Sequence, residues 1–80
     1  MKSDGTTQLT ARIAARRSLP EPAMRRAIRR AAGASLEEVA AAFDPKVSRY
    51  AVMAWERGTR NPGPSNLAQY VAILRMLQGL

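Results

Sequence analysis

The side chains of this chain that could do chemistry are its basic ones. Lysine and arginine number 13 against 6 acidic residues, which gives the 80-residue chain a formal net charge of +7. Histidine and cysteine do not occur, which excludes thiolate and imidazole metal ligands, disulfide scaffolds and the usual histidine general bases. The chemistry that remains is the binding of anions by guanidinium and ammonium groups. We therefore expect a binding protein and not an enzyme, with no cofactor and no metal.

A charge this large in a small chain favours a polyanionic partner, nucleic acid first and an anionic membrane surface second. A bias toward alanine and arginine also arises in GC-rich genomes, so composition alone does not establish nucleic-acid binding. No apolar run approaches the roughly 20 residues that span a membrane, and the start M-K-S-D-G-T-T-Q lacks the apolar core of a signal peptide. We expect one small domain in the cytoplasm.

A short helix is predicted over residues 36–43. Ser35 and Glu38 have the S-x-x-E spacing of a capping box, in which the serine hydroxyl accepts a hydrogen bond from the N–H of residue 38 and the glutamate accepts one from the N–H of residue 35. Asp44-Pro45 ends this helix, because proline lacks an N–H and biases the residue before it away from helical dihedrals.

A second short helix is predicted over residues 48–57. Ser48 supplies its N-terminal cap, and Gly58 closes it at a position suited to left-handed dihedrals. The two helices and the turn between them form a helix-turn-helix arrangement.

Three more helices are predicted from the spacing of apolar residues and from the prolines and glycines between them. They are expected over residues 7–17, 22–32 and 64–78, with residues 1–6 disordered. No alternation typical of strands is visible. The expected fold class is therefore all-α, a single compact domain of five helices over residues 7–80.

Two of these helices are strongly basic. The helix over 22–32 has an apolar stripe of Met24, Ile28 and Ala31 or Ala32, and its four arginines form either a solvated basic face or partners for acidic groups. In the helix over 7–17, we expect Leu9 and Ile13 to pack onto the domain. Its arginines could instead follow a DNA backbone or enter a minor groove, and the helix could also form a dimer contact.

From Met24 to Leu77, the chain resembles the lambda-repressor-like helix-turn-helix family of phage repressors, Cro proteins and related bacterial regulators. The matching segments are R-R-A-I-R-R-A-A-G-A-S, L-E-E-V-A-A-A-F, V-S-R-Y-A-V-M-A-W-E-R-G and R-N-P-G-P. The most specific element is W-E-R-G followed by a basic residue and proline, and short actinobacterial-phage regulators look especially similar. Two features depart from the family: D-P-K lengthens the turn, and Leu36 replaces the glutamine that often contacts a phosphate.

The resemblance implies a sequence-specific transcriptional regulator that binds operator DNA, with the helix over 48–57 in the major groove. The positions that would face base edges are Arg49, Tyr50, Met53 and Ala54. The planar fork of Arg49 matches O6 and N7 of guanine, whereas its alternative roles are a phosphate contact or a solvated residue near the cap. Tyr50 could contact a base or a phosphate, or pack on the turn.

The resemblance also implies phosphate contacts at the two ends of this helix. They are assigned to Lys46, Ser48, Arg57 and Arg60, with Ser48 also acting as the cap. Such contacts fix the register of the protein on the duplex and supply the salt-dependent part of affinity without reading sequence.

Glu56 is out of place in a segment that faces DNA. The family often pairs this carboxylate with an arginine of the first core helix, which here would be Arg29, so the resemblance implies a structural ion pair. The remaining apolar positions are assigned to the core, including Trp55. The core residues expected are Ile28, Leu36, Val39, Phe43, Val52, Trp55, Leu67, Val71 and Leu74.

Double-stranded operator DNA is the expected partner, in a bacterial host and on its nucleoid, with no membrane and no small-molecule ligand. A homodimer that forms in solution or only on DNA is also expected, through the C-terminal helix (Tyr70, Leu74, Leu77, Leu80) or the N-terminal helix. The main alternative is an antitoxin or adaptor that uses the helix-turn-helix domain mainly to bind protein. A basic amphipathic protein acting at membranes is a further alternative.

Overall fold

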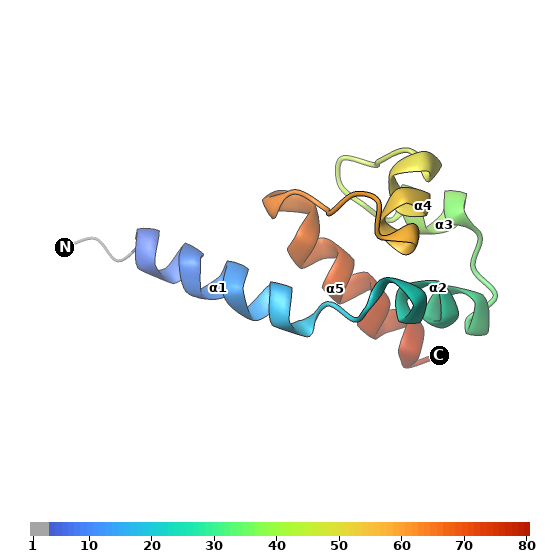
Figure 1. The fold of residues 1–80 in the computed structure, drawn as a ribbon, viewed down its shortest axis with the longest axis horizontal. Coiled ribbons are helices and arrows are strands. Elements are labelled where there is room, and N and C mark those ends of the chain that lie inside the picture. The colour runs from blue at the N-terminus through green and yellow to red at the C-terminus, as the bar shows by residue number, and fades with distance from the viewer. Residues whose placement is uncertain (1–3) are drawn as a thin grey trace.

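The structure, a computed structural model, describes residues 4–80. This part of the chain contains five α-helices and no strand, which confirms the all-α prediction. The helices are α1 (Asp4–Ser18), α2 (Pro22–Ala31), α3 (Leu36–Ala41), α4 (Arg49–Arg57) and α5 (Pro64–Gln78). Helices α2 to α5 gather into one body, and α1 extends from it as an arm (Figure 1). None of the described helices is long and apolar enough to cross a membrane.

The helix boundaries differ from the prediction mainly at the N-terminus. Helix α1 starts at Asp4, so the expected disorder is wrong for residues 4–6, while residues 1–3 lie outside the described part. The Thr10 hydroxyl donates to the Thr6 carbonyl at 2.9 Å, one turn back. Helices α2 and α3 end one or two residues before the predicted positions, and α5 matches its predicted bounds.

The predicted caps of α3 and α4 are present. The N–H of Glu38 donates to the Ser35 hydroxyl at 3.0 Å, and the N–H of Ser35 donates to the Glu38 carboxylate at 2.8 Å. Ser48 accepts from the N–H of Ala51 at 3.1 Å, so this serine precedes α4 as its cap and is not its first helical residue. Gly58 closes α4 with a φ of 73°.

An aromatic cluster forms the centre of the core. Phe43, Trp55 and Tyr70 lie within 5.9 Å of one another between ring centroids, in tilted arrangements, which are favourable for aromatic pairs. Except for Leu36, every residue predicted for the core is buried. Leu36, the first residue of α3, is half-buried and packs against this core.

The long turn between α3 and α4 is held by a side chain from α5. The Gln69 amide accepts from the N–H of Asp44 at 2.8 Å and donates to the Asp44 carbonyl at 3.2 Å. In addition, the N–H of Val47 donates to the Ala40 carbonyl at 3.2 Å. These bonds satisfy backbone groups of Asp44 and Val47 and hold the turn against α3 and α5.

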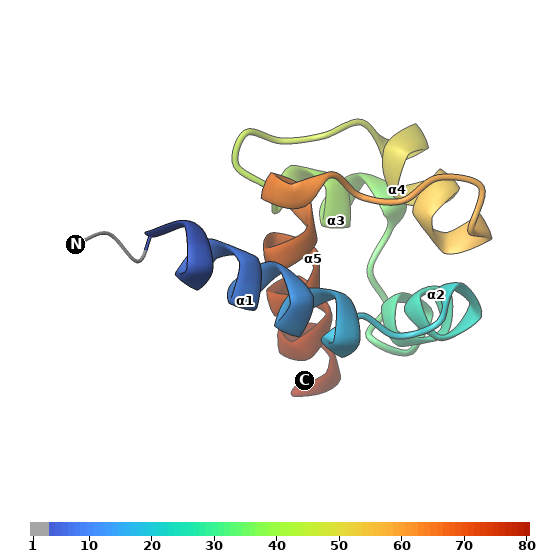
Figure 2. The ribbon, with the colours of Figure 1, turned by 60° about the vertical axis from the view of Figure 1, so that its left-hand side comes forward.

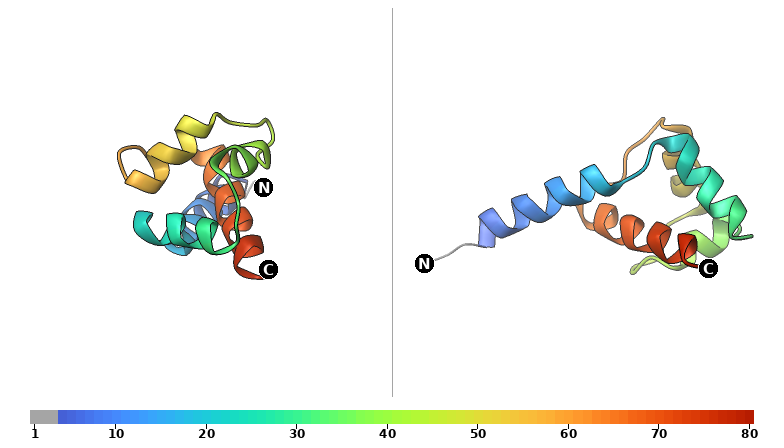
Figure 3. Two further views of the ribbon diagram at one scale, coloured as in Figure 1. Left: turned by 90° about the vertical axis from the view of Figure 1, so that its right-hand side faces the viewer. Right: turned by 90° about the horizontal axis from the view of Figure 1, so that it is seen from below.

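Helix α1 touches the rest of the domain near its C-terminal end. Arg75 of α5 donates to the Ser18 hydroxyl at 3.2 Å, and Leu19 packs against the core. Leu9 and Ile13 are 53% and 37% exposed, so the expected packing of these two onto the domain is wrong. The core of α2 to α5 closes without them, and α1 runs outward along the 46 Å length of the molecule (Figures 2 and 3).

Candidate nucleic-acid interface

Helix α4 has one buried face and one face open to solvent. Val52, Trp55 and Glu56 are buried. Residues spaced by three or four along a helix share a face, so Tyr50, Ala54 and Arg57 lie on the opposite side. Tyr50 is 64% exposed and Arg57 is exposed, whereas Ala54 is half-buried. The outward face of α4 therefore presents an aromatic hydroxyl and a guanidinium on either side of a small residue.

Arg25 of α2 holds the C-terminal end of α4. Its Nε donates to the Pro20 carbonyl at 2.7 Å and its Nη1 donates to the Trp55 carbonyl at 2.9 Å, with only 7% of the residue exposed. Trp55 lies in the last turn of α4, where its carbonyl accepts a long 3.4 Å bond from the N–H of Gly58 and the helix dipole favours a further cationic donor. One guanidinium thus links the α1–α2 connection to the end of α4.

The burial of Arg25 corrects the predicted orientation of α2. Met24, expected in the apolar stripe, is 53% exposed, whereas Arg25 points inward beside Ile28. The rest of the predicted stripe holds, since Ile28 is buried and Ala32 packs against the core. Only Met24 gives its place to Arg25, whose guanidinium has carbonyl partners in the interior. A pattern based on apolar residues alone counts such arginines as surface, so the sequence carried no signal for Arg25.

The expected ion pair between Arg29 and Glu56 is present. Arg29 donates to the two carboxylate oxygens of Glu56 at 2.6 and 3.0 Å, and its Nη1 donates to the Ala34 carbonyl at 2.9 Å. The two side chains are 13% and 5% exposed. The hydrogen bond to Glu56 raises the pKa of Arg29 above its ordinary value, and burial acts in the opposite direction. This pair joins α2 to the buried face of α4.

Arg49 begins α4 and lies at the surface. Its Nη1 donates to a Glu37 carboxylate oxygen at 2.6 Å, and its guanidinium carbon lies 5.3 Å from the centre of the Tyr50 ring. Within residues 4–80, Nε and Nη2 of Arg49 make no hydrogen bond. These two nitrogens share one edge of the guanidinium, the arrangement that a bidentate contact with an acceptor pair requires.

Sequence reasoning missed Glu37. It lies in the first turn of α3, twelve residues before its partner, and no local spacing links the two positions. The hydrogen bond from Arg49 lowers the pKa of the Glu37 carboxyl below its ordinary value, and the same bond raises the pKa of Arg49. The alternative in which Tyr50 packs on the turn is wrong, since its ring lies in solvent next to Arg49.

The four residues assigned to phosphate contacts are all exposed. Lys46 and Ser48 precede α4, whereas Arg57 ends it and Arg60 follows its C-terminal cap. The Ser48 hydroxyl accepts from the backbone and keeps its own hydrogen for a further bond. The structure therefore places cations at both ends of α4, on either side of the predicted base-contacting positions.

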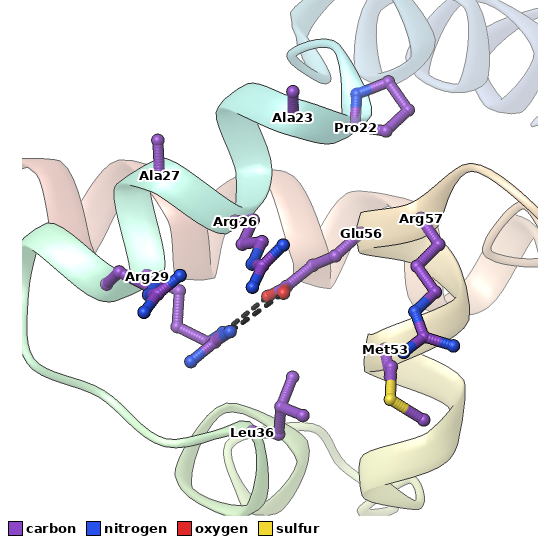
Figure 4. A pocket seen from close by; sticks show the side chains of 10 residues that line it. Pro22, Ala23, Arg26, Ala27, Arg29, Leu36, Met53, Glu56 and Arg57 are labelled. Atoms are coloured by element: carbon purple, nitrogen blue, oxygen red, sulfur yellow. Dashed lines mark hydrogen bonds and ion pairs between the residues drawn. The ribbon is translucent and has the colours of Figure 1, made fainter.

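A groove of about 790 Å³ lies between α2 and α4 and reaches the start of α3 (Figure 4). We call it the basic groove, because four arginines and one glutamate line it. Its lining residues are Pro22, Ala23, Arg26, Ala27, Arg29, Arg30, Leu36, Met53, Glu56 and Arg57. Of the predicted base-contacting residues, the groove contains Met53, which is half-buried.

The described residues offer no group of three or more acidic, histidine or cysteine side chains that could hold a metal ion. The exposed side chains around α4 include four cations, Lys46, Arg49, Arg57 and Arg60. Comparison of the chain with family profiles, with curated proteins and with solved structures gave no match.

Proposed function

We propose that this chain is a sequence-specific regulator of transcription that binds double-stranded DNA, with the lambda-repressor-like fold of phage Cro and repressor proteins. The observation that carries the proposal is the arrangement of α4. Its buried face is bound to α2 through Arg25 and Arg29. Tyr50 and Arg57 are exposed on its outward face, and Arg49, its first residue, is exposed as well. A helix held in this way can enter a major groove as a rigid element.

Arg49 is the proposed reader of a guanine. Its Nη1 is occupied by Glu37, which leaves the edge with Nε and Nη2 for the O6 and N7 acceptors of the base. Ala54 lies one turn further along α4 and offers apolar contact to a thymine methyl group, as does Met53. Tyr50 supplies a hydroxyl for a base or a phosphate.

The proposed action is occupancy of an operator, with no catalytic step. Two-fold sites are the usual targets of such domains, because two copies double the contacts and set the spacing of the half-sites near one helical turn. Tyr70, Leu74 and Leu77 are buried in the core of their own domain, so they do not form a dimer surface. Met76 and Leu80 remain exposed on the C-terminal side and are available to a second copy on DNA.

Selection from random duplexes, followed by sequencing, tests the proposal. We expect the purified protein to enrich a motif with two-fold repetition, and Arg49→Ala to lose the preference for guanine at one position of each half-site. Arg75→Ala removes an arginine from α5 and serves as the control that keeps the motif. Enrichment of no motif by the wild-type protein would overturn the proposal.

One observation favours an adaptor or antitoxin as a second candidate. Helix α1 extends from the domain with Leu9 and Ile13 exposed on it, and an exposed apolar helix face suits a protein partner. A stable partner that co-purifies with the wild-type chain but not with Leu9→Asp would support this function, and a monomeric chain that selects a DNA motif would contradict it.

A further inference from the structure

We infer that the basic groove binds the sugar-phosphate backbone of DNA, with Arg26 and Arg30 of α2 as phosphate ligands beside Arg57. Neither α2 residue was assigned to DNA from the sequence. Because this inference places a duplex on α4, it rests on the function proposed above and extends the contact surface from α4 to α2.

The charge of the groove is the first support. Glu56 is its single acidic residue, and both oxygens of that carboxylate already accept from Arg29. Within residues 4–80, the ion pairs are Arg29–Glu56 and Arg49–Glu37, so Arg26, Arg30 and Arg57 have no carboxylate partner there. Arg26 and Arg30 also stand four residues apart on one helix, where like charges repel. A bound phosphate would relieve this repulsion.

The walls of the groove are the second support. Part of the lining is apolar: Ala23 and Ala27 come from α2, while Leu36 and Met53 lie across from them on α3 and α4 (Figure 4). A site for a free hydrated anion gains nothing from apolar walls. A phosphodiester carries deoxyribose carbons on both sides of its charge, so it can contact arginines and apolar side chains together.

Continuity with α4 identifies the source of the phosphate. Met53 and Arg57 line the groove and also belong to the residues of α4 assigned to bases and phosphates. A strand whose bases meet α4 therefore passes the mouth of the groove. A free nucleotide or another phosphorylated small molecule has the same chemistry, but only the duplex accounts for the position of the groove beside the outward face of α4.

The test compares the salt dependence of duplex binding in Arg26→Gln, Arg30→Gln and wild type. Glutamine keeps a long helix-forming side chain and removes one charge, and neither exposed arginine makes an ion pair in residues 4–80, so we expect both variants to fold. The slope of log Kobs against log salt is negative. For each variant, we expect it to become shallower by about 0.9, with affinity reduced uniformly across DNA sequences. The matched control is Arg75→Gln, which removes an arginine outside the groove and leaves the slope unchanged.

A second arm follows the Arg26, Arg30 and Arg57 Nε–H signals by NMR during titration with a deoxynucleoside monophosphate or with inorganic phosphate. Unchanged duplex slopes overturn the assignment, and saturable binding of the mononucleotide would then show that the groove serves a free phosphate compound. The two experiments together distinguish a failure of the groove assignment from a failure of the proposed function. If the wild type selects no motif while the slopes fall as expected, the groove binds backbone without sequence reading. If a motif is selected but the slopes are unchanged, the groove assignment alone fails.

Discussion

Two arginine–glutamate pairs lie at opposite ends of α4 and have the same closest nitrogen–oxygen distance, but their surroundings differ. In each pair, the closest nitrogen–oxygen distance is 2.6 Å. Arg29 meets Glu56 with two hydrogen bonds and side-chain exposures of 13% and 5%. Arg49 meets Glu37 with one hydrogen bond and exposures of 48% and 60%.

The comparison shows that distance alone does not determine the role of an ion pair. Water competes for the exposed charges and salt screens them, so Arg49 can exchange Glu37 for another acceptor at little expense in stability. Removing one partner of a buried pair leaves an uncompensated charge in a poor solvent. The buried pair is therefore a structural element of the domain, and the exposed pair is suited to ligand binding.

The largest expected effect comes from breaking the buried pair. Glu56→Ala leaves the Arg29 guanidinium with the Ala34 carbonyl alone, and we expect a loss of about 3 kcal/mol in the free energy of unfolding. For a domain of this size, Tm should fall by more than about 10 °C in a thermal melt. Glu37→Ala is the matched control and should leave Tm nearly unchanged. Equal Tm values for the two variants would contradict the difference drawn between the pairs.

The next effect concerns Gly58, which closes α4 next to Pro22 of α2. Gly58 has a φ of 73°, and a Cβ there would lie 3.2 Å from the Pro22 side chain, whereas Gly33 has a φ of 75° and open space. We expect Gly58→Ala to lose about 2 kcal/mol and Gly33→Ala about 1 kcal/mol, since both incur left-handed strain and only the first also meets a neighbour. Chemical denaturation measures the difference, and equal losses would show that the Pro22 contact is soft.

A smaller effect is expected where a buried polar group has no partner. The Tyr70 hydroxyl is buried and has no hydrogen-bond partner in residues 4–80. Burial, and to a smaller extent the negative charge of Glu56, raises the pKa of Tyr70 to about 12. We expect Tyr70→Phe to stabilise the fold by about 1 kcal/mol, because the unsatisfied group is removed. A loss of stability would show that the hydroxyl has a partner, such as a buried water.

The raised pKa of Tyr70 predicts how the stability of the fold changes at alkaline pH. A phenol of ordinary pKa in the unfolded chain, about 10, ionises before the folded Tyr70 does. The stability linked to this residue is therefore complete below pH 10 and is lost as the pH rises toward the folded value. Denaturation of wild type and Tyr70→Phe between neutral and alkaline pH checks the sign, and the variant should lack this part of the alkaline loss.

The smallest effect concerns the exposed pair and is read by titration. The Glu37 carboxyl has a pKa below its ordinary value, first because Arg49 donates to it and second because of a backbone hydrogen bond, so in Arg49→Ala we expect the pKa to rise toward the usual range. Since the folded value is the lower one, the pairing contributes above the unfolded pKa and is lost as the pH falls through the folded value. Carboxyl carbon NMR measures this titration, and equal pKa values in the two proteins would show that the pair does not persist in solution.

Local rules accounted for much of the fold. The capping box of Ser35 and Glu38, the cap at Ser48 and the left-handed Gly58 were all predicted correctly, because each depends on residues within one helical turn. The bounds of α5 were predicted for the same reason, with Pro64 at its first position and a regular apolar stripe. The Arg29–Glu56 pair was anticipated only through the family resemblance.

Contacts between distant residues were not predictable from local patterns. Arg25 reaches Trp55 across 30 positions and Arg49 reaches Glu37 across twelve. The expected packing of Leu9 and Ile13 failed for the related reason that an apolar side chain is buried only if the rest of the domain leaves a surface for it.

The helices, their caps, the absence of thiol and imidazole chemistry and the large positive charge follow directly from the order and types of the residues. These depend on composition and on interactions between neighbours in the chain. The packing of the helices determines which arginines are buried and hydrogen-bonded between α2 and α4, which pair at the surface and which line the basic groove. A guanidinium has the same charge at every position of the chain, and its role depends on which carbonyls, carboxylates and water molecules the folded chain brings to it.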